Sequence, residues 1–280
     1  MAAGADVVVE AVRSGDHDRY LCALYAPQDK RDALLALYAF NAEIAGVRDR
    51  IREALPGEVR LQWWRDVIAS DEADAGAGNP VAEALKAAIA AHNLPKAAFD
   101  NYLEARIFDL YDDPMPSRTD LEGYCGETAS ALIQLAAIVL DPATAPAFAE
   151  LAGRAGCAQA MTGLLLLLPR HRARGQCFVP ADLLAAVGTS REEFLSGDGG
   201  PGAARAASAM IALAREHLAA FEREAARLPQ PLRPAFLPLA LTGAYLDRME
   251  RPGFSALKDT ARLSLLGRHW LLLRRATKGW

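Results

Sequence analysis

Apolar residues recur at steps of three and four positions along almost the whole chain. In the segment 32–51 (DALLALYAFNAEIAGVRDRI), Leu34, Leu37 and Tyr38 fall on one broad face when the segment is drawn as a helix. The segment 203–228 is rich in alanine, which has a high helix propensity. Clusters of β-branched residues, which would indicate strands, are nearly absent apart from one valine triplet near the start. The pattern therefore predicts an all-α fold.

Several helix boundaries can be predicted from capping residues. Asn79 is suited to cap a helix that Pro95 stops, and Thr119 with Glu122 has the spacing of a capping box. The glycine-rich segment 196–202 (SGDGGPG) predicts a flexible loop, and the other breaks are short. We expect about eight or more helices with short connections.

The composition narrows the classes of protein that fit. The chain has 280 residues, of which 52% are hydrophobic and 24% charged, as in a folded globular protein. A net charge of -4 argues against nucleic acid as a partner. No apolar run approaches the roughly 20 residues of a membrane-spanning helix, and the start resembles neither a signal peptide nor a transit peptide. The four cysteines and five histidines have no disulfide or zinc spacing, so we predict a cytoplasmic protein. We also predict that residues 1–280 form a single domain.

Five segments then carry a family resemblance. In chain order they are RYLCALYAPQDKRDALLALYAFNAEIAGVRD (19–49), RLQWWRD (60–66), ARIFDLYDD (105–113), the region 124–129, and CAQAMTG to RGQCFVP (157–180). This ordered set resembles the squalene/phytoene synthases, all-helical enzymes that join two prenyl diphosphates head to head. The resemblance covers nearly the whole chain. It implies the isoprenoid synthase fold, a helical bundle around an apolar channel.

The resemblance fails at the residues that should be catalytic. Enzymes of that family carry two motifs of paired aspartates, and spacing of four residues puts both carboxylates on one helix face to hold Mg²⁺. In the first motif Ala45 and Gly46 replace aspartates and only Asp49 remains, while Leu167 and His171 stand at the second. Leucine does not bind Mg²⁺, so we expect no metal cofactor and no prenyl diphosphate ionisation.

One branch of the family lacks the same aspartates, that of a mitochondrial complex I assembly factor. The segments RYLCALY, AFNAEIAGV, LQWW and PRHRARGQCFVP are similar to that branch. The resemblance implies a role in respiratory complex I assembly, with a respiratory-complex subunit as partner. The start of the chain, which does not resemble a transit peptide, favours a bacterial relative in the cytoplasm or in peripheral contact with the inner membrane. Two alternatives stay open: an active prenyltransferase that uses Mg²⁺ through other ligands, and a carrier of an isoprenoid or anionic lipid.

The candidate ligand-binding residues follow from the resemblance and from the charge beside the second motif. We expect Ala45 and Gly163 to face the same channel as the candidates, and the arginines to hold an anionic head group without metal. Simpler interpretations are a buried leucine helix at 164–168 and a solvated basic turn after it. The candidate residues are Tyr38, Asn41, Asp49, Asp109, Gln159, Leu167, Arg170, Arg172 and Arg174.

The C-terminal segment 264–280 (SLLGRHWLLLRRATKGW) is amphipathic. Drawn as a helix it places leucine and tryptophan on a broad side, with arginine and lysine supplying cations. Such a helix fits either an anionic bilayer surface or docking on the bundle, and we favour docking slightly. A peripheral membrane contact is thus an alternative that the sequence leaves open.

Overall fold

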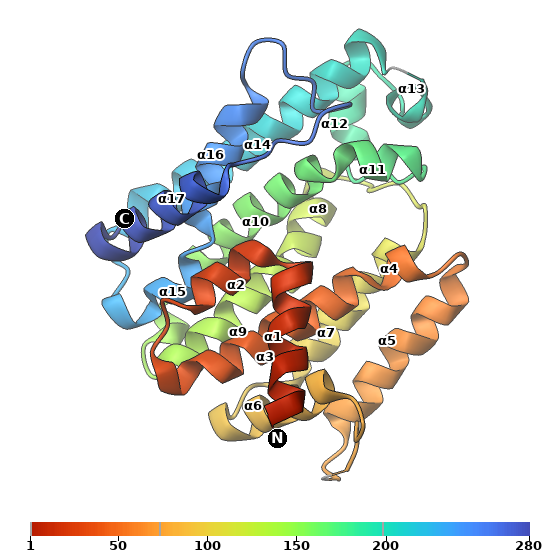
Figure 1. Cartoon of the computed structure of the whole chain (residues 1–280). Coiled ribbons are helices and arrows are strands. Elements are labelled where there is room, and N and C mark those ends of the chain that lie inside the picture. Colours follow the sequence, from red (N-terminus) through yellow and green to blue (C-terminus); the bar gives the residue numbers. More distant parts are fainter. Residues whose placement is uncertain (1, 73, 198) are drawn as a thin grey trace. The chain divides into compact units, whose positions relative to one another are not determined.

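The protein is built from helices. The computed structural model describes residues 2–72, 74–197 and 199–280, and these residues contain no strand (Figure 1). They divide into two compact units, and each unit is assembled from segments that are far apart in the sequence. The all-α prediction and the expected number of helices are confirmed. Because the segments of the units alternate along the chain, neither unit is one continuous stretch, and the single domain 1–280 stays a prediction.

The first unit comprises the described residues up to Tyr111 together with Ala131–Ala149 and Pro229–Leu237. Its helix α3 packs against α1, α2, α6 and α9. The helices of this unit are α1 (Ala2–Gly15), α2 (His17–Ala23), α3 (Gln28–Ala45), α4 (Val47–Arg50), α5 (Ala54–Ala69), α6 (Pro80–His92), α7 (Lys96–Ile107), α9 (Ala131–Leu140) and α15 (Arg233–Phe236), with short 3₁₀ turns at Phe108–Leu110, Ala145–Phe148 and Gln230–Leu232.

An aromatic cluster forms the centre of the first unit. Phe40 of α3 lies 5.1 Å from Trp64, 5.6 Å from Phe99 and 5.2 Å from Tyr102, measured between ring centroids. All four side chains are buried. Edge-to-face and tilted ring pairs of this kind stabilise a core beyond the area they bury. The cluster therefore ties α3, α5 and α7 together.

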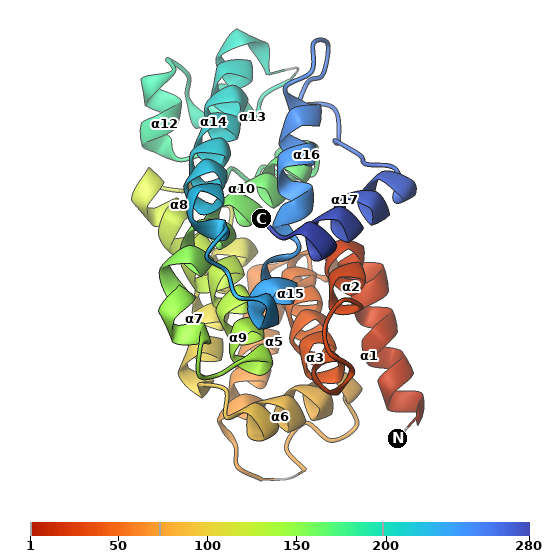
Figure 2. The ribbon, with the colours of Figure 1, turned by 90° about the vertical axis from the view of Figure 1, so that its left-hand side faces the viewer.

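The second unit comprises Asp112–Ser130, Glu150–Leu228 and Pro238–Trp280. Its longest helix, α14, packs against α12, α13 and α16, and α14 and α16 lie side by side in both views (Figures 1 and 2). The helices of this unit are α8 (Arg118–Cys125), α10 (Ala149–Leu166), α11 (Leu168–Ala173), α12 (Ala181–Ala186), α13 (Arg191–Leu195), α14 (Gly200–Ala225), α16 (Leu239–Met249) and α17 (Leu265–Lys278), with a π turn at Gly126–Ser130.

The predicted helix boundaries have different outcomes. Asn79 caps α6 as expected, because its side chain accepts hydrogen bonds from the amides of Val81 and Ala82. The expected cap at Thr119 is wrong: α8 starts earlier, and Ser117 accepts from the amide of residue 120. Ser117 is an equally good capping residue two positions upstream. The valine triplet 7–9 is helical, within α1. The predicted flexible loop 196–202 is too long, because Gly200–Gly202 form the first turn of α14; residue 198 lies outside the described residues.

One continuous helical stretch has the length and mean hydropathy of a membrane-spanning helix. It runs over Arg118–Leu140 and includes α8, the π turn and α9. By length and mean hydropathy, this stretch contradicts the expectation that no segment of the chain could span a membrane. However, 61% of its apolar window is buried inside the protein, as in the core helix of a folded chain. Length and composition here are weak evidence for a membrane span.

A close helix approach in the second unit depends on glycine. A Cβ atom at position 156 of α10 would lie 2.1 Å from the Oγ atom and 2.3 Å from the amide nitrogen of Ser130. The same Ser130 hydroxyl donates a hydrogen bond of 3.0 Å to the carbonyl of Gly153. A Cβ at Gly153, in contrast, would meet no atom within 4 Å. Gly156 is therefore required by packing, and Gly153 is not.

These two glycines make a matched pair of variants. We expect Gly156→Ala to lower the free energy of unfolding by about 3 kcal/mol, because backbone at Ser130 must move to admit the methyl group. Gly153→Ala should raise it by about 0.5–1 kcal/mol, since alanine is the better helix former. Urea unfolding of both variants gives the two values. Equal effects of the same sign would contradict the packing argument.

Candidate functional site

The first motif position coincides with the end of a helix. Helix α3 ends at Ala45, and Gly46 caps it with an amide hydrogen bond of 3.1 Å to the carbonyl of Ala42. Asp49 then lies on the separate short helix α4, and both Ala45 and Asp49 are exposed. The predicted single helix over 32–51 is thus interrupted. Because position 45 is alanine, no carboxylate lies four residues before Asp49.

Two other acidic groups of this unit are paired with arginine. Glu43, the nearest carboxylate before the first motif, lies 3.1 Å from Arg60. Asp109, a predicted site residue, lies 2.9 Å from Arg106 Nη1, and both side chains are mostly buried. A carboxylate that is already neutralised by a guanidinium is a weaker metal ligand than a solvated one. Neither residue therefore completes the missing pair.

Asn41 belongs to a buried polar network. Its Oδ1 atom accepts a hydrogen bond of 2.8 Å from the Tyr102 hydroxyl and one of 3.5 Å from Arg106 Nη2. Arg106 Nε also donates to the Tyr102 hydroxyl at 3.2 Å. Through Arg106 the network reaches Asp109, so the fold brings two predicted site residues together. Buried polar groups need such partners, since an unmade hydrogen bond costs about 1–3 kcal/mol.

Tyr38, one turn before Asn41, is buried next to a second arginine. The guanidinium carbon of Arg19 is 5.9 Å from the Tyr38 ring centroid, and Arg19 is held by an ion pair to Asp16, the N-cap of α2. Burial raises the pKa of the Tyr38 hydroxyl well above its usual range, and burial likewise raises the pKa of Tyr102. Both hydroxyls therefore stay protonated at neutral pH.

The second motif lies at a junction between two helices. Helix α10 ends at Leu166 and α11 begins at Leu168 with Pro169 in its first turn, as the proline predicts. The simple interpretation of a buried leucine helix is only partly right: Leu165 and Leu168 are buried, but Leu167 is 45% exposed. His171 is buried, with its ring 4.8 Å from that of Phe178. The two motif positions therefore lie in different surroundings.

Arg172 binds backbone carbonyls of its own unit. Its Nε donates to Phe194 at 2.7 Å and its Nη1 to Leu257 at 3.2 Å. Its Nη2 donates to the carbonyls of Ser196 at 3.1 Å and Gly197 at 3.2 Å. One guanidinium thus joins α11 to the end of α13 and to the loop before α17. These contacts give Arg172 a structural role. Its predicted role as an anion ligand does not account for them.

The remaining predicted residues are spread over the two units. Tyr38, Asn41, Asp49 and Asp109 belong to the first unit, and the others belong to the second. Arg170 is exposed, whereas Arg174, Gly163 and Gln159 are half-buried. That all of them line one channel, and that Gln159, Leu167, Arg170 and Arg174 contact a ligand, stays a prediction.

The side chains do not form a metal site that the geometry makes evident. Among residues 2–72, 74–197 and 199–280, no three histidine, cysteine, aspartate or glutamate side chains are grouped to hold a metal ion. The four cysteines are free thiols in buried positions. The residues at the two motif positions, which are alanine, glycine, leucine and histidine beside one exposed aspartate, do not fit a magnesium cluster.

Sequence reasoning missed Arg19, Tyr102 and Arg106, which surround Tyr38 and Asn41. The pairing of Arg106 with Asp109 had a signal, since the residues are three apart at the end of a helix. Tyr102 had none, because it meets Asn41 from 61 positions away. Contacts of that kind depend on how α7 packs on α3.

The carbonyl contacts of Arg172 predict a large effect on stability. We expect Arg172→Ala to lower the free energy of unfolding by about 3 kcal/mol, because charge-assisted hydrogen bonds are lost and carbonyls lose their donor. Arg170→Ala, two residues away and exposed, should change it by less than about 0.5 kcal/mol. Urea unfolding measures both. Equal stability of the two variants would contradict the structural position of Arg172.

The buried tyrosines predict a dependence on alkaline pH. Because the pKa of both hydroxyls is raised in the folded state, their contribution is complete below pH about 10 and is lost as the pH rises further. The unfolding free energy should fall by up to about 1.4 kcal/mol per pH unit for each tyrosine. Tyr38→Phe and Tyr102→Phe should each flatten that slope. A slope above pH 10 that neither variant changes would contradict the assignment.

The fold is that of known isoprenoid synthases. A dehydrosqualene synthase solved in complex with a ligand superposes with a TM-score of 0.85 over 99% of this chain and 96% of that one, at 16% identity. The squalene synthase HpnC from Alicyclobacillus acidocaldarius gives a TM-score of 0.74 over 90% and 94% of the two chains, at 21% identity. Identities this low show the fold alone. The predicted isoprenoid synthase fold is confirmed.

Sequence comparison adds two kinds of relative. The NADH dehydrogenase (ubiquinone) complex I assembly factor 6 of Rattus norvegicus is 31% identical over 246 residues, which cover 88% of this chain and 74% of the rat protein. The human protein of the same name is 29% identical over the same share. A phytoene synthase of Rhodobacter capsulatus is 24% identical over 70% of this chain and 58% of its own length.

The family model for squalene/phytoene synthase matches residues 12–268. This range includes both motif positions and all of the predicted site residues. It also includes helices of both units, so the match does not rest on one segment. The resemblance in the five segments is therefore confirmed over nearly the full length. The chain belongs to the squalene/phytoene synthase family.

Proposed function

We propose that this protein acts in the assembly of respiratory complex I. The observation that carries the proposal is the 31% identity to complex I assembly factor 6 of the rat over 88% of the chain. Similarity across almost the whole length supports a shared role better than one shared motif does. The partner is then a subunit or assembly intermediate of complex I. The location is the cytoplasm, with peripheral contact to the membrane that carries the complex.

The same proposal includes the loss of magnesium-dependent chemistry. When a diphosphate group departs from a prenyl chain, negative charge develops on its oxygens. Metal ions normally supply the positive charge that stabilises these oxygens. Here Ala45 leaves Asp49 without a carboxylate four residues before it, and Leu167 replaces an aspartate at the second motif. Two other carboxylates of the first unit are already paired with arginine, Asp109 with Arg106 and Glu43 with Arg60. These features support a protein that uses the family fold without the metal cluster.

An active head-to-head prenyltransferase is the alternative function. It is favoured by the phytoene synthase of Rhodobacter capsulatus among the relatives, at 24% identity. Such an activity needs Mg²⁺ held by residues outside the two motifs. Asp49 is the remaining motif carboxylate, and one carboxylate makes a poor site for a hard divalent cation. We therefore rank this alternative below the assembly role.

Binding of an isoprenoid or an anionic lipid is compatible with either function. Helical bundles of this fold hold apolar ligands between their helices. Arg170 and Arg174 remain the proposed contacts for an anionic head group, because guanidinium groups bind phosphate with forked hydrogen bonds. Arg172 is a poor subject for a ligand-binding test, since its removal is expected to disturb the unit itself. A variant in Arg170 and Arg174 tests the ligand without that effect.

Deletion of the gene tests the assembly role. We expect the organism that carries it to lose assembled complex I and its NADH:ubiquinone oxidoreductase activity, with other respiratory complexes unchanged. Native gel electrophoresis and activity staining of isolated membranes measure both. The parent gene should restore the complex, and so should Asp49→Asn, because the proposed role needs no metal. Normal complex I in the deletion strain would contradict the proposal.

An assay of the purified protein separates the alternative. Incubated with farnesyl or geranylgeranyl diphosphate and Mg²⁺, the chain should release no pyrophosphate, while the phytoene synthase of Rhodobacter capsulatus serves as the active control. Turnover on the order of 1 s⁻¹ that Asp49→Asn abolishes would establish the prenyltransferase instead.

A further inference from the structure

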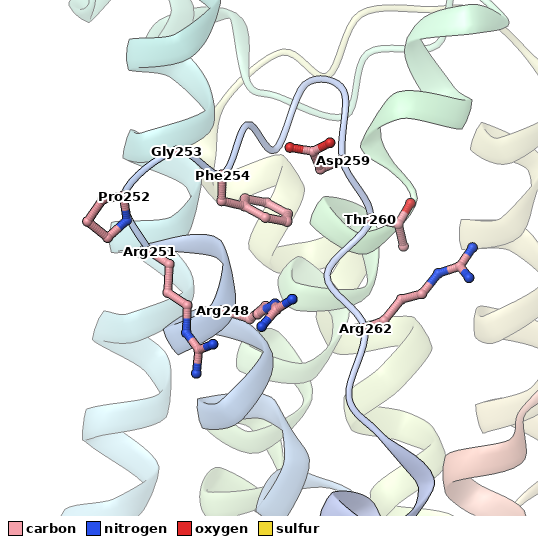
Figure 3. Close-up of a pocket in the computed structure, with 8 residues that line it drawn as sticks. All are labelled: Arg248, Arg251, Pro252, Gly253, Phe254, Asp259, Thr260 and Arg262. Atoms are coloured by element: carbon pink, nitrogen blue, oxygen red, sulfur yellow. The ribbon is translucent and has the colours of Figure 1, made fainter.

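A basic pocket lies in the second unit, away from both motif positions in the sequence. It occupies about 510 Å³ between the end of α16 and the loop that leads to α17 (Figure 3). Arg248 lines it from the last turn of α16, Arg251 from just after that helix, and Arg262 from the segment that returns toward α17. Phe254 and Thr260 complete the wall that matters here.

The three arginines of this pocket have no ion-pair partner within the described part of the chain. The acidic residues that flank them in sequence are used elsewhere: Asp247 and Glu250 lie 2.5 Å and 2.6 Å from Arg215 of α14. Asp259 is the acidic residue among those lining the pocket. Its carboxylate accepts a hydrogen bond of 3.0 Å from the amide of Ser255. Positive charge therefore remains in excess around the cavity.

The position of Arg248 at the end of a helix has a simpler explanation, which covers that residue alone. A cation in the last turn of α16 is stabilised by the negative end of the helix dipole. Arg251 and Arg262 lie outside the helix, and the dipole falls off within one turn. The helix dipole therefore accounts for the charge of Arg248 and not for that of Arg251 or Arg262.

The chemistry of the pocket fits a phosphate group. Guanidinium groups present forked donors that match phosphate oxygens, and the Thr260 hydroxyl adds another donor. All three arginines are exposed, so water stabilises their charge and leaves their donors accessible to a ligand. The volume exceeds that of a bare ion, which leaves room for a group attached to the phosphate, next to the ring of Phe254.

The helix that follows the pocket indicates where such a phosphate comes from. Helix α17 starts three residues after Arg262, and its Leu265, Leu266, Trp270 and Leu273 are 62%, 84%, 64% and 47% exposed. Arg274 and Lys278 line a second pocket together with Trp270 and Leu273. Exposed leucine and tryptophan next to cations are typical of helices that lie in the interface of an anionic bilayer.

We infer that the arginine pocket binds the phosphate of an anionic phospholipid at a bilayer surface, while the exposed face of α17 enters the acyl boundary. Because the α17 side chains are exposed, the sequence-based preference for simple docking of this helix is only half right. Leu272 is buried and Trp280 packs edge-on against Phe221 at 4.6 Å, so one face docks and the other remains for lipid. The inference does not depend on the assembly role.

Vesicle flotation of the full chain tests this inference. Phosphatidylcholine vesicles with and without phosphatidylglycerol are compared for the parent and for Arg248→Gln/Arg251→Gln/Arg262→Gln. The parent should prefer the anionic vesicles, and the pocket variant should lose about 100-fold in affinity for them. The control variant Arg50→Gln/Arg52→Gln/Arg223→Gln removes the same charge from exposed positions elsewhere and should bind like the parent. Thermal unfolding confirms that both variants fold.

Further arms separate the sources of the phosphate and the role of the helix. Leu266→Ser/Trp270→Ser should weaken binding to the anionic vesicles while leaving the preference for them over neutral vesicles. Calorimetry with glycerol 3-phosphate should give much weaker binding than the vesicles. The inference is overturned if the pocket variant binds like the parent, if both arginine variants lose affinity equally, or if glycerol 3-phosphate binds and vesicles do not.

Discussion

The middle of helix α3 is buried on every side, and much of the first unit depends on that constraint. Eight consecutive residues, 34–41, are buried, so this part of the helix has no face left for solvent. A helix in that position must find partners for its few polar atoms inside the protein. Asn41 finds them in Tyr102 and Arg106, and Arg106 in turn holds Asp109. One packing requirement thus fixes the polar network at the first motif.

The same constraint explains how far the sequence could predict the fold. Period, capping and propensity are local, so the all-α class, the cap at Asn79 and the turn at Pro169 followed from neighbouring residues. The pairing of Tyr102 with Asn41 and the carbonyl contacts of Arg172 join segments 61 and up to 85 positions apart. Such contacts depend on the packed structure, and no local pattern distinguishes Arg172 from Arg170.

The partner of each arginine in this protein is set by contacts in the folded structure and not by the residues next to it in the sequence. Arg172 stands in the basic segment that suggested an anion site, yet its donors bind carbonyls. Arg248 and Arg251 stand among acidic residues, yet those acids turn to Arg215. A count of charges along the chain would therefore misplace the excess. In the folded structure, the pocket arginines, which have no acidic partner within the described residues, lie at the end of α16 and in the loop after it.

In the proposed function, the chain keeps the family fold without the family's metal cluster. Titration of the purified protein with Mn²⁺, followed by electron paramagnetic resonance, tests it most directly. The titration is run with and without a non-hydrolysable farnesyl diphosphate analogue and compared with the analogue alone. The account predicts that the protein adds no bound Mn²⁺ to what the analogue binds by itself. Stoichiometric Mn²⁺ held by the protein, and lost in Asp49→Asn, would contradict it.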